Sequence, residues 1–137
     1  MGFAPCKRRA MNSFLLVAAG GAIGASLRHG AGLLGARHLP ATWPWATFSV
    51  NLIGGLAMGL VAGWFAYKAT EGGQDLRLFL ATGVLGGFTT FSAFSLETLN
   101  MLRSGEAAKA AAYAALSVIL SVAALGFGLW IARRAFA

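Results

Sequence analysis

The chain has 137 residues, of which 58% are hydrophobic and only 11% are charged. Soluble domains carry about 25% charged residues, so this composition excludes an ordinary soluble domain and indicates a single integral membrane domain. The formal net charge is +7, but the lysines and arginines lie mostly at the ends of apolar stretches rather than in a basic stripe. A nucleic-acid-binding protein is therefore excluded as well.

Four apolar stretches are each long enough to cross a bilayer, which takes about 20 residues in a helix. They cover residues 13–34, 45–67, 76–102 and 107–132, and residues 1–12 form a basic extension before the first. The first stretch continues well past the length of a signal-peptide core, so a retained helix is expected. The sequence predicts an all-α membrane protein with four transmembrane helices per subunit.

The first span contains GGAIGASLRH, residues 20–29, with Arg28 toward its end. An arginine at membrane depth costs at least about 2.5 kcal/mol, so its side chain should reach the interface or face a wet cavity. Two interpretations remain open at this point. Arg28 either anchors the end of the helix or attracts anions at a vestibule.

In the second span, Thr47, Asn51, Gly55, Gly59 and Gly63 follow one another at spacings of four. A helix places residues with this spacing on one face, and the glycines predict close packing of a neighbouring helix there. The Asn51 amide then either forms an interhelical hydrogen bond or donates to a permeating anion.

The third span contains GVLGGFTTFSAFSLET, residues 83–98, which is the most informative segment of the chain. Adjacent glycines weaken a helix, and unwound backbone at membrane depth is tolerated only inside protein or beside a cavity. We therefore expect a break in the middle of this helix. Phe91 and Phe94 share a face just after it, and their positively polarised ring edges could hold a small anion. Glu97, the only carboxylate well inside a span, is expected near a helix end.

In the fourth span, Tyr113, Ser117 and Ser121 also follow at spacings of four. Such a row of hydroxyls either packs against a neighbouring helix or replaces the water ligands of an ion. Across the spans, the polar groups are mostly hydrogen-bond donors, which favours an anion pathway over a cation pathway. No catalytic motif is present, and an enzyme is not expected.

Two other functions stay open from the residues alone. A proton-coupled exporter of small cations would need a membrane-embedded carboxylate, for which Glu97 is the only candidate. A non-conducting structural subunit would leave the Asn51 and serine faces without a role.

Four spans place both termini on the same side of the membrane. The basic residues on that side are Lys7, Arg8, Arg9, Lys68, Arg77, Arg133 and Arg134, and those on the other side are Arg37, Arg103 and Lys109, with Arg28 as a possible fourth. Without the first ten residues the count becomes four against three or four, and Met11 is an alternative start. Such a balance would permit insertion in both orientations and an antiparallel dimer.

Together these motifs resemble the Fluc (CrcB) family of small fluoride channels. The resemblance runs from Gly20 to about Ser121 through GGAIGASLRH, WPWATFSVNLIGG (43–55), GVLGGFTTFSAFSLET and YAALSVILS (113–121). Ala93 stands where the family usually has threonine, and Ala46 where glycine is common.

The resemblance implies a fluoride-selective passive channel in the bacterial inner membrane, built as a dual-topology homodimer of antiparallel subunits. By similarity, the pore would be lined by Asn51, Phe91, Phe94, Tyr113, Ser117, Ser121, Thr47 and Arg28. It also implies a structural Na⁺ ion at the dimer centre, bound by the backbone carbonyls of Gly86 and Thr89 from each subunit.

Overall fold

The computed structural model describes residues 4–68 and 73–137, and all its regular elements within these ranges are helices. They are α1 (Ala4–His38), α2 (Trp45–Lys68), α3 (Gly73–Arg77), the π-helical segment η1 (Leu78–Leu85), α4 (Gly86–Phe88), α5 (Phe91–Arg103) and α6 (Ala107–Phe136). Four helical stretches, 10–38, 45–68, 73–103 and 107–136, are long and apolar enough to span a membrane. The predicted all-α class with four spans is confirmed. Residues 1–3 of the predicted basic extension lie outside the described residues.

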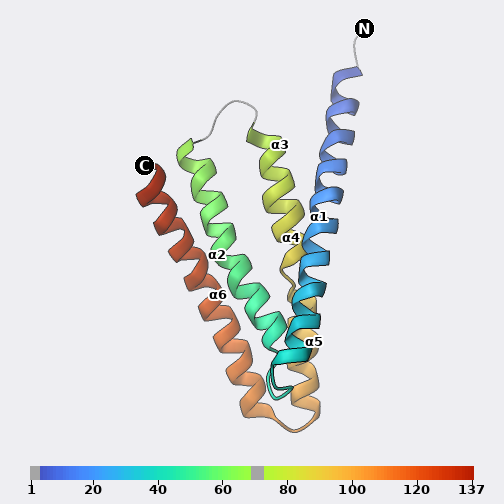
Figure 1. Ribbon diagram of the computed structural model, residues 1–137, viewed down its shortest axis with the longest axis vertical. Coiled ribbons are helices and arrows are strands. Elements are labelled where there is room, and N and C mark those ends of the chain that lie inside the picture. The colour runs from blue at the N-terminus through green and yellow to red at the C-terminus, as the bar shows by residue number, and fades with distance from the viewer. Residues whose placement is uncertain (1–3, 69–72) are drawn as a thin grey trace.

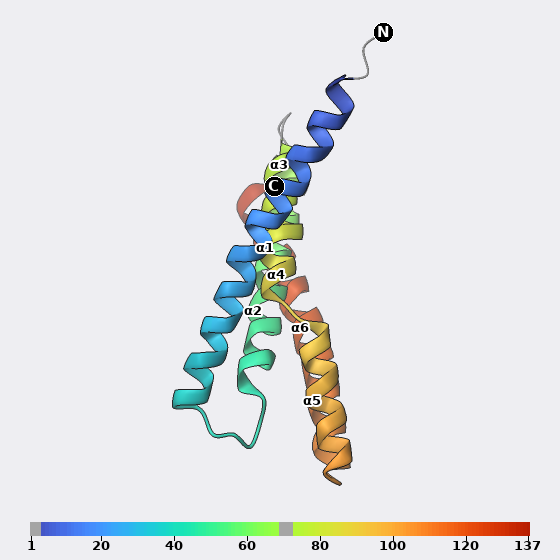
Figure 2. The same ribbon diagram turned by 90° about the vertical axis from the view of Figure 1, so that its right-hand side faces the viewer.

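The four spans run up and down, so that both termini lie at one end of the molecule (Figure 1). The α1–α2 connection and the tight turn between α5 and α6 lie at the opposite end. A view at right angles shows α1 and α5 diverging toward that opposite end (Figure 2). The lower halves of α5 and α6 therefore stand apart from α1.

Helices α2 and α6 pack closely along the glycine face that the second span predicted. A Cβ atom at Gly55 would lie 2.7 Å from the carbonyl oxygen of Ser121, and one at Gly59 would collide with the carbonyl of Leu125. At Gly63 an added Cβ would collide with the side chain of Ala132. The backbones approach so closely because these positions have no side chain, as in other small-residue interfaces of membrane helices.

Helix α1 packs in the same manner against the first half of the third span. A Cβ atom at Gly83 would lie 2.9 Å from the Cα of Gly20, and one at Gly87 would lie 2.6 Å from the carbonyl oxygen of Gly21. This contact falls on η1 and α4, directly before the helix break. The half of the third span nearer the termini thus packs against α1, whereas the half after the break packs against α6.

The third span is broken in its middle, as predicted. Helix α4 ends at Phe88, and Thr89 and Thr90 adopt extended backbone conformations, with ψ angles of 156° and 121°. The Thr90 side chain then caps α5, because its hydroxyl oxygen accepts a hydrogen bond from the Ala93 N–H at 3.2 Å. Such N-capping replaces one of the bonds that a helix start lacks. Thr90 therefore ends one helical direction and begins the next.

Candidate functional site

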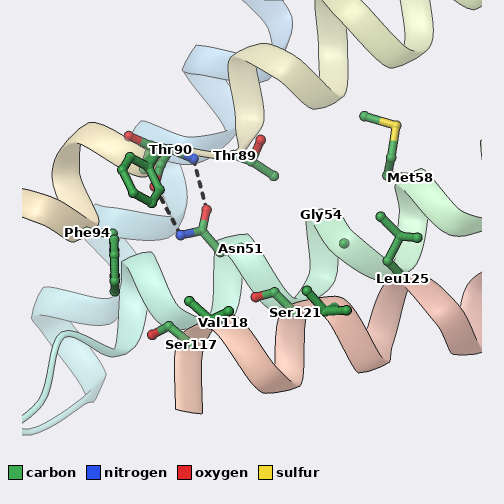
Figure 3. Close-up of a pocket in the computed structure, with 13 residues that line it drawn as sticks. Asn51, Gly54, Met58, Thr89, Thr90, Phe94, Ser117, Val118, Ser121 and Leu125 are labelled. Carbon is green, nitrogen blue, oxygen red and sulfur yellow. Dashed lines mark hydrogen bonds between the residues drawn. The ribbon is translucent and has the colours of Figure 1, made fainter. Parts of the chain in front are cut away.

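Beside the break, α2, α5 and α6 border a cavity of about 390 Å³ (Figure 3). Five of the eight predicted pore residues line it, namely Asn51, Phe91, Phe94, Ser117 and Ser121. The rest of the wall includes the break itself at Thr89 and Thr90 and apolar side chains such as Met58 and Leu125. The structure thus brings residues from three different spans to one mostly apolar space with a few polar groups, which is the usual character of a binding site.

Asn51 connects α2 to the break with a pair of hydrogen bonds. Its Nδ2 donates to the carbonyl oxygen of Thr90 at 3.0 Å, and its Oδ1 accepts from the Thr90 N–H at 2.9 Å (Figure 3). Both backbone groups of Thr90 are satisfied in this way, although the residue is extended at membrane depth. A side-chain amide carries two N–H donors. One Nδ2 hydrogen therefore holds the break, and the other is available to a ligand in the cavity.

Phe91 and Phe94 lie against each other with their ring centroids 5.4 Å apart and their planes at 45°. The Phe94 ring continues to Tyr113, also at 5.4 Å between centroids. Phe91 is 75% exposed in the single chain, although it lines the cavity. The two rings are therefore placed as the sequence predicted, but one chain covers only part of the Phe91 surface.

The hydroxyl groups of Tyr113 and Thr47 form hydrogen bonds with a residue that the sequence did not assign to them. The Tyr113 hydroxyl donates to Glu97 Oε2 at 2.7 Å, and the Thr47 hydroxyl donates to Glu97 Oε1 at 2.6 Å. Glu97 lies in the middle of α5, not near its end, so that part of the expectation is wrong. The carboxylate instead links α2, α5 and α6, with both oxygens hydrogen-bonded as a carboxylate away from bulk water requires.

Ser117 is the hydroxyl of the α6 row that has no such partner. Its side chain is buried, and among the described residues none forms a hydrogen bond with its Oγ. Ser121 lines the same cavity one turn further along α6. Both serines therefore line the cavity, and the Ser117 hydroxyl has no acceptor within the described part of the chain.

Arg28 lies outside this arrangement. It is half-buried on α1, and the residues that line the cavity come from α2, the break, α5 and α6. A single chain therefore does not bring Arg28 to the site, and its predicted role in attracting anions stays a prediction.

The break contains the carbonyl groups of Gly86 and Thr89, which the family resemblance assigned to a cation. In a continuous helix, the Thr90 N–H would donate to the Gly86 carbonyl and the Ala93 N–H to the Thr89 carbonyl. Here the Thr90 N–H donates to Asn51 Oδ1, and the Ala93 N–H donates to Thr90 Oγ1. Both carbonyls have thus lost their regular helical donors. Carbonyl oxygens that lack their helical donors at membrane depth suit a hard monovalent cation, so the residues fit a Na⁺ ion.

Comparison with known proteins shows which family the chain belongs to. The family model described as CrcB-like protein, Camphor Resistance (CrcB), matches residues 15–129. The chain belongs to the CrcB family. Relatives of the chain carry the name fluoride-specific ion channel FluC. The protein from Hyphomonas neptunium is 69% identical over 93% of this chain and all of its own length. Those from Caulobacter sp. strain K31 and Caulobacter vibrioides NA1000 are 52% and 47% identical over 92% and 93% of this chain, and over 98% and 100% of their own lengths.

Proposed function

We propose that this chain is a fluoride-selective ion channel, not an enzyme, that carries fluoride passively out of the cytoplasm and so lowers its toxicity. The 69% identity over 93% of the chain to a relative named as a fluoride-specific channel carries this proposal. The four membrane-spanning helices and the bacterial relatives support a multi-pass protein of the bacterial inner membrane.

The cavity supplies the chemistry that such a channel needs. Fluoride is a small anion that holds its water strongly, so a pathway must offer donors in place of that water. The free Asn51 N–H, the serine hydroxyls of α6 and the positively polarised edges of Phe91 and Phe94 are groups of this kind. Fluoride enters cells as the neutral acid and ionises inside. A membrane potential that is negative inside then favours exit by about 2.3 kcal/mol per charge for each 100 mV, and no ATP is needed.

The proposal includes an antiparallel homodimer with a structural Na⁺ ion at its centre. Phe91 is 75% exposed in one chain although it belongs to the proposed pathway, so a second chain would have to cover it. The carbonyls of Gly86 and Thr89 from both subunits would hold the Na⁺ ion. When bound, this cation would compensate backbone dipoles that the break leaves without partners.

Anion efflux from liposomes tests the proposed function. Vesicles loaded with fluoride and containing the purified protein are expected to release fluoride quickly and chloride slowly, with or without a proton gradient. A flux that requires the proton gradient would favour the cation exporter instead. Vesicles that retain fluoride as protein-free vesicles do would favour a structural subunit and contradict the channel.

A further inference from the structure

Two buried side-chain donors in the described part of the chain have no hydrogen-bond partner, namely Ser117 Oγ and Trp43 Nε1. The proposed pathway accounts for Ser117. Trp43 precedes α2 in the α1–α2 connection, and the cavity does not include it. A buried donor without an acceptor costs free energy, and in folded proteins such a donor commonly binds a water molecule or an ion. The Trp43 N–H is therefore a donor that the described part of the chain leaves without an acceptor.

Trp43 lies at the Tyr113 level of the proposed pathway. The rings of Trp43 and Tyr113 meet edge to face, with centroids 5.4 Å apart and planes at 90°. Tyr113 in turn contacts Phe94, whose ring lines the cavity. A single ring, that of Tyr113, thus separates the Trp43 indole from the aromatic pair of the site.

At this level the hydroxyl donors are already in use. The Tyr113 and Thr47 hydroxyls both donate to Glu97. An anion that moves outward from Ser117 along α6 therefore meets a tyrosine whose hydroxyl is occupied. The indole N–H of Trp43 is the unoccupied donor next to that tyrosine.

The position of Trp43 in the fold suits the mouth of a pathway. Ser121, Ser117 and Tyr113 follow α6 toward its start, and eight residues of helix cover about 12 Å. The start of α6 and the α1–α2 connection lie at the same end of the molecule (Figure 1). Trp43 lies in that connection, two residues before α2 begins at Trp45, and its ring contacts Tyr113, the last of these three residues. The partial positive charge of that helix end also favours an anion nearby.

We propose that the Trp43 indole N–H binds fluoride at the outer mouth of the pathway, as a position separate from the cavity. This inference rests on the proposed function, since it assigns one further residue to the same anion route. The alternative is that the N–H points at the face of the Tyr113 ring. Such an N–H···π contact is weak and would leave no place for an ion.

The test compares Trp43→Phe with Trp45→Phe in fluoride efflux from liposomes over a range of fluoride concentrations. Trp43→Phe keeps an aromatic ring but removes the donor. It is expected to raise the half-saturating fluoride concentration roughly ten-fold or more, as for the loss of one hydrogen bond to a charged ligand. Trp45 is 39% exposed, and its ring contacts both Trp43 and Phe48. Trp45→Phe therefore changes the packing around Trp43 but keeps the Trp43 N–H, and it is expected to match the unmodified protein.

A binding measurement keeps the inference testable if Trp43→Phe folds poorly. In protein labelled with ¹⁵N at the indole nitrogens, fluoride should shift the Trp43 N–H resonance at concentrations where chloride does not. An unshifted resonance, or a Trp43→Phe variant with unchanged half-saturation, would overturn the inference while the channel function stands. Absence of fluoride flux in the unmodified protein would instead contradict the proposed function.

Discussion

Asn51 shows how one side chain serves both the fold and the site. Its two hydrogen bonds to Thr90 hold the break, and its second amide hydrogen remains for an ion. The sequence left these two roles as alternatives, whereas the structure makes them compatible. The interhelical bond is confirmed, and the contact with fluoride stays a prediction.

Asn51→Asp is expected to reduce fluoride flux at least ten-fold. The carboxylate lacks N–H groups, so it would face the Thr90 carbonyl without a donor and repel an approaching anion. Asn100→Asp is the matched control, because it adds the same charge at an exposed position of α5. Efflux from liposomes measures both variants. If Asn51→Asp conducted like Asn100→Asp, Asn51 would not contact the ion.

Phe91→Ile and Phe94→Ile are each expected to lower fluoride flux strongly while the protein still folds. Isoleucine keeps the apolar volume but removes the polarised ring edge. Phe94→Ile should also lower stability by about 0.5–1.5 kcal/mol for each lost ring contact, because Phe94 touches both Phe91 and Tyr113. Phe14→Ile on α1, where the ring is 77% exposed, provides the control. If either variant conducted like the control, the two rings would serve only packing and would not contact the ion.

Glu97 marks the limit of what the sequence could predict at this scale. Spacings of four placed Thr47 with Asn51 on one face, and Tyr113 with Ser117 on another. They could not show which residue of a third helix lies between these faces. The break lets α5 take its own direction and brings Glu97 between Thr47 and Tyr113. A lone carboxylate inside a span was a sufficient reason to look for two donors around it.

At the level of helices, the glycine pattern predicted that a neighbouring helix packs closely on α2, because small residues along one helical face are typical of such interfaces. The π-helical segment η1 was not predicted, since LFLATGVL contains no sequence signal that distinguishes it from an α-helix. The sequence also did not show which helix packs against α2. Only the structure shows that Gly128 of α6 faces Gly59, so that a side chain on either residue would meet the opposite backbone.

Gly128→Ala is expected to lower the stability of the protein by about 1–3 kcal/mol, the usual cost of overpacking. An added Cβ at Gly128 would collide with the carbonyl of Leu56, whereas one at Gly126 has no neighbouring atom within 4 Å. Gly126→Ala should therefore be neutral or stabilise the helix by up to about 1 kcal/mol. Thermal unfolding in detergent compares the two. Equal stability of the two variants would contradict the close α2–α6 contact.

At the scale of the whole molecule, the balance of charges governs how the chain inserts. A chain that starts at Met11 is expected to place its C-terminus on both sides of the membrane in comparable amounts. Lys7, Arg8 and Arg9 should shift the distribution toward a cytoplasmic C-terminus, because basic residues are retained on that side. Labelling of a cysteine added after Ala137 measures the ratio on intact cells, with Cys6 replaced by serine in the longer chain. Replacement of the three basic residues by alanine keeps the length constant. A single orientation of the shorter chain would contradict dual topology.

The proposed Na⁺ ion makes dimer formation depend on the helix break, because the carbonyls of Gly86 and Thr89 would complete the ion's coordination only when two chains meet. Replacing Na⁺ by N-methyl-D-glucamine at constant ionic strength is expected to raise the monomer fraction on dilution in detergent and to slow fluoride efflux. Both effects should reverse when Na⁺ is restored. Crosslinking and efflux measured on the same samples separate loss of the dimer from loss of the pathway. A dimer and a flux that are both indifferent to the exchange would leave the two carbonyls without this cation, and hydrogen bonds from water would then have to satisfy them.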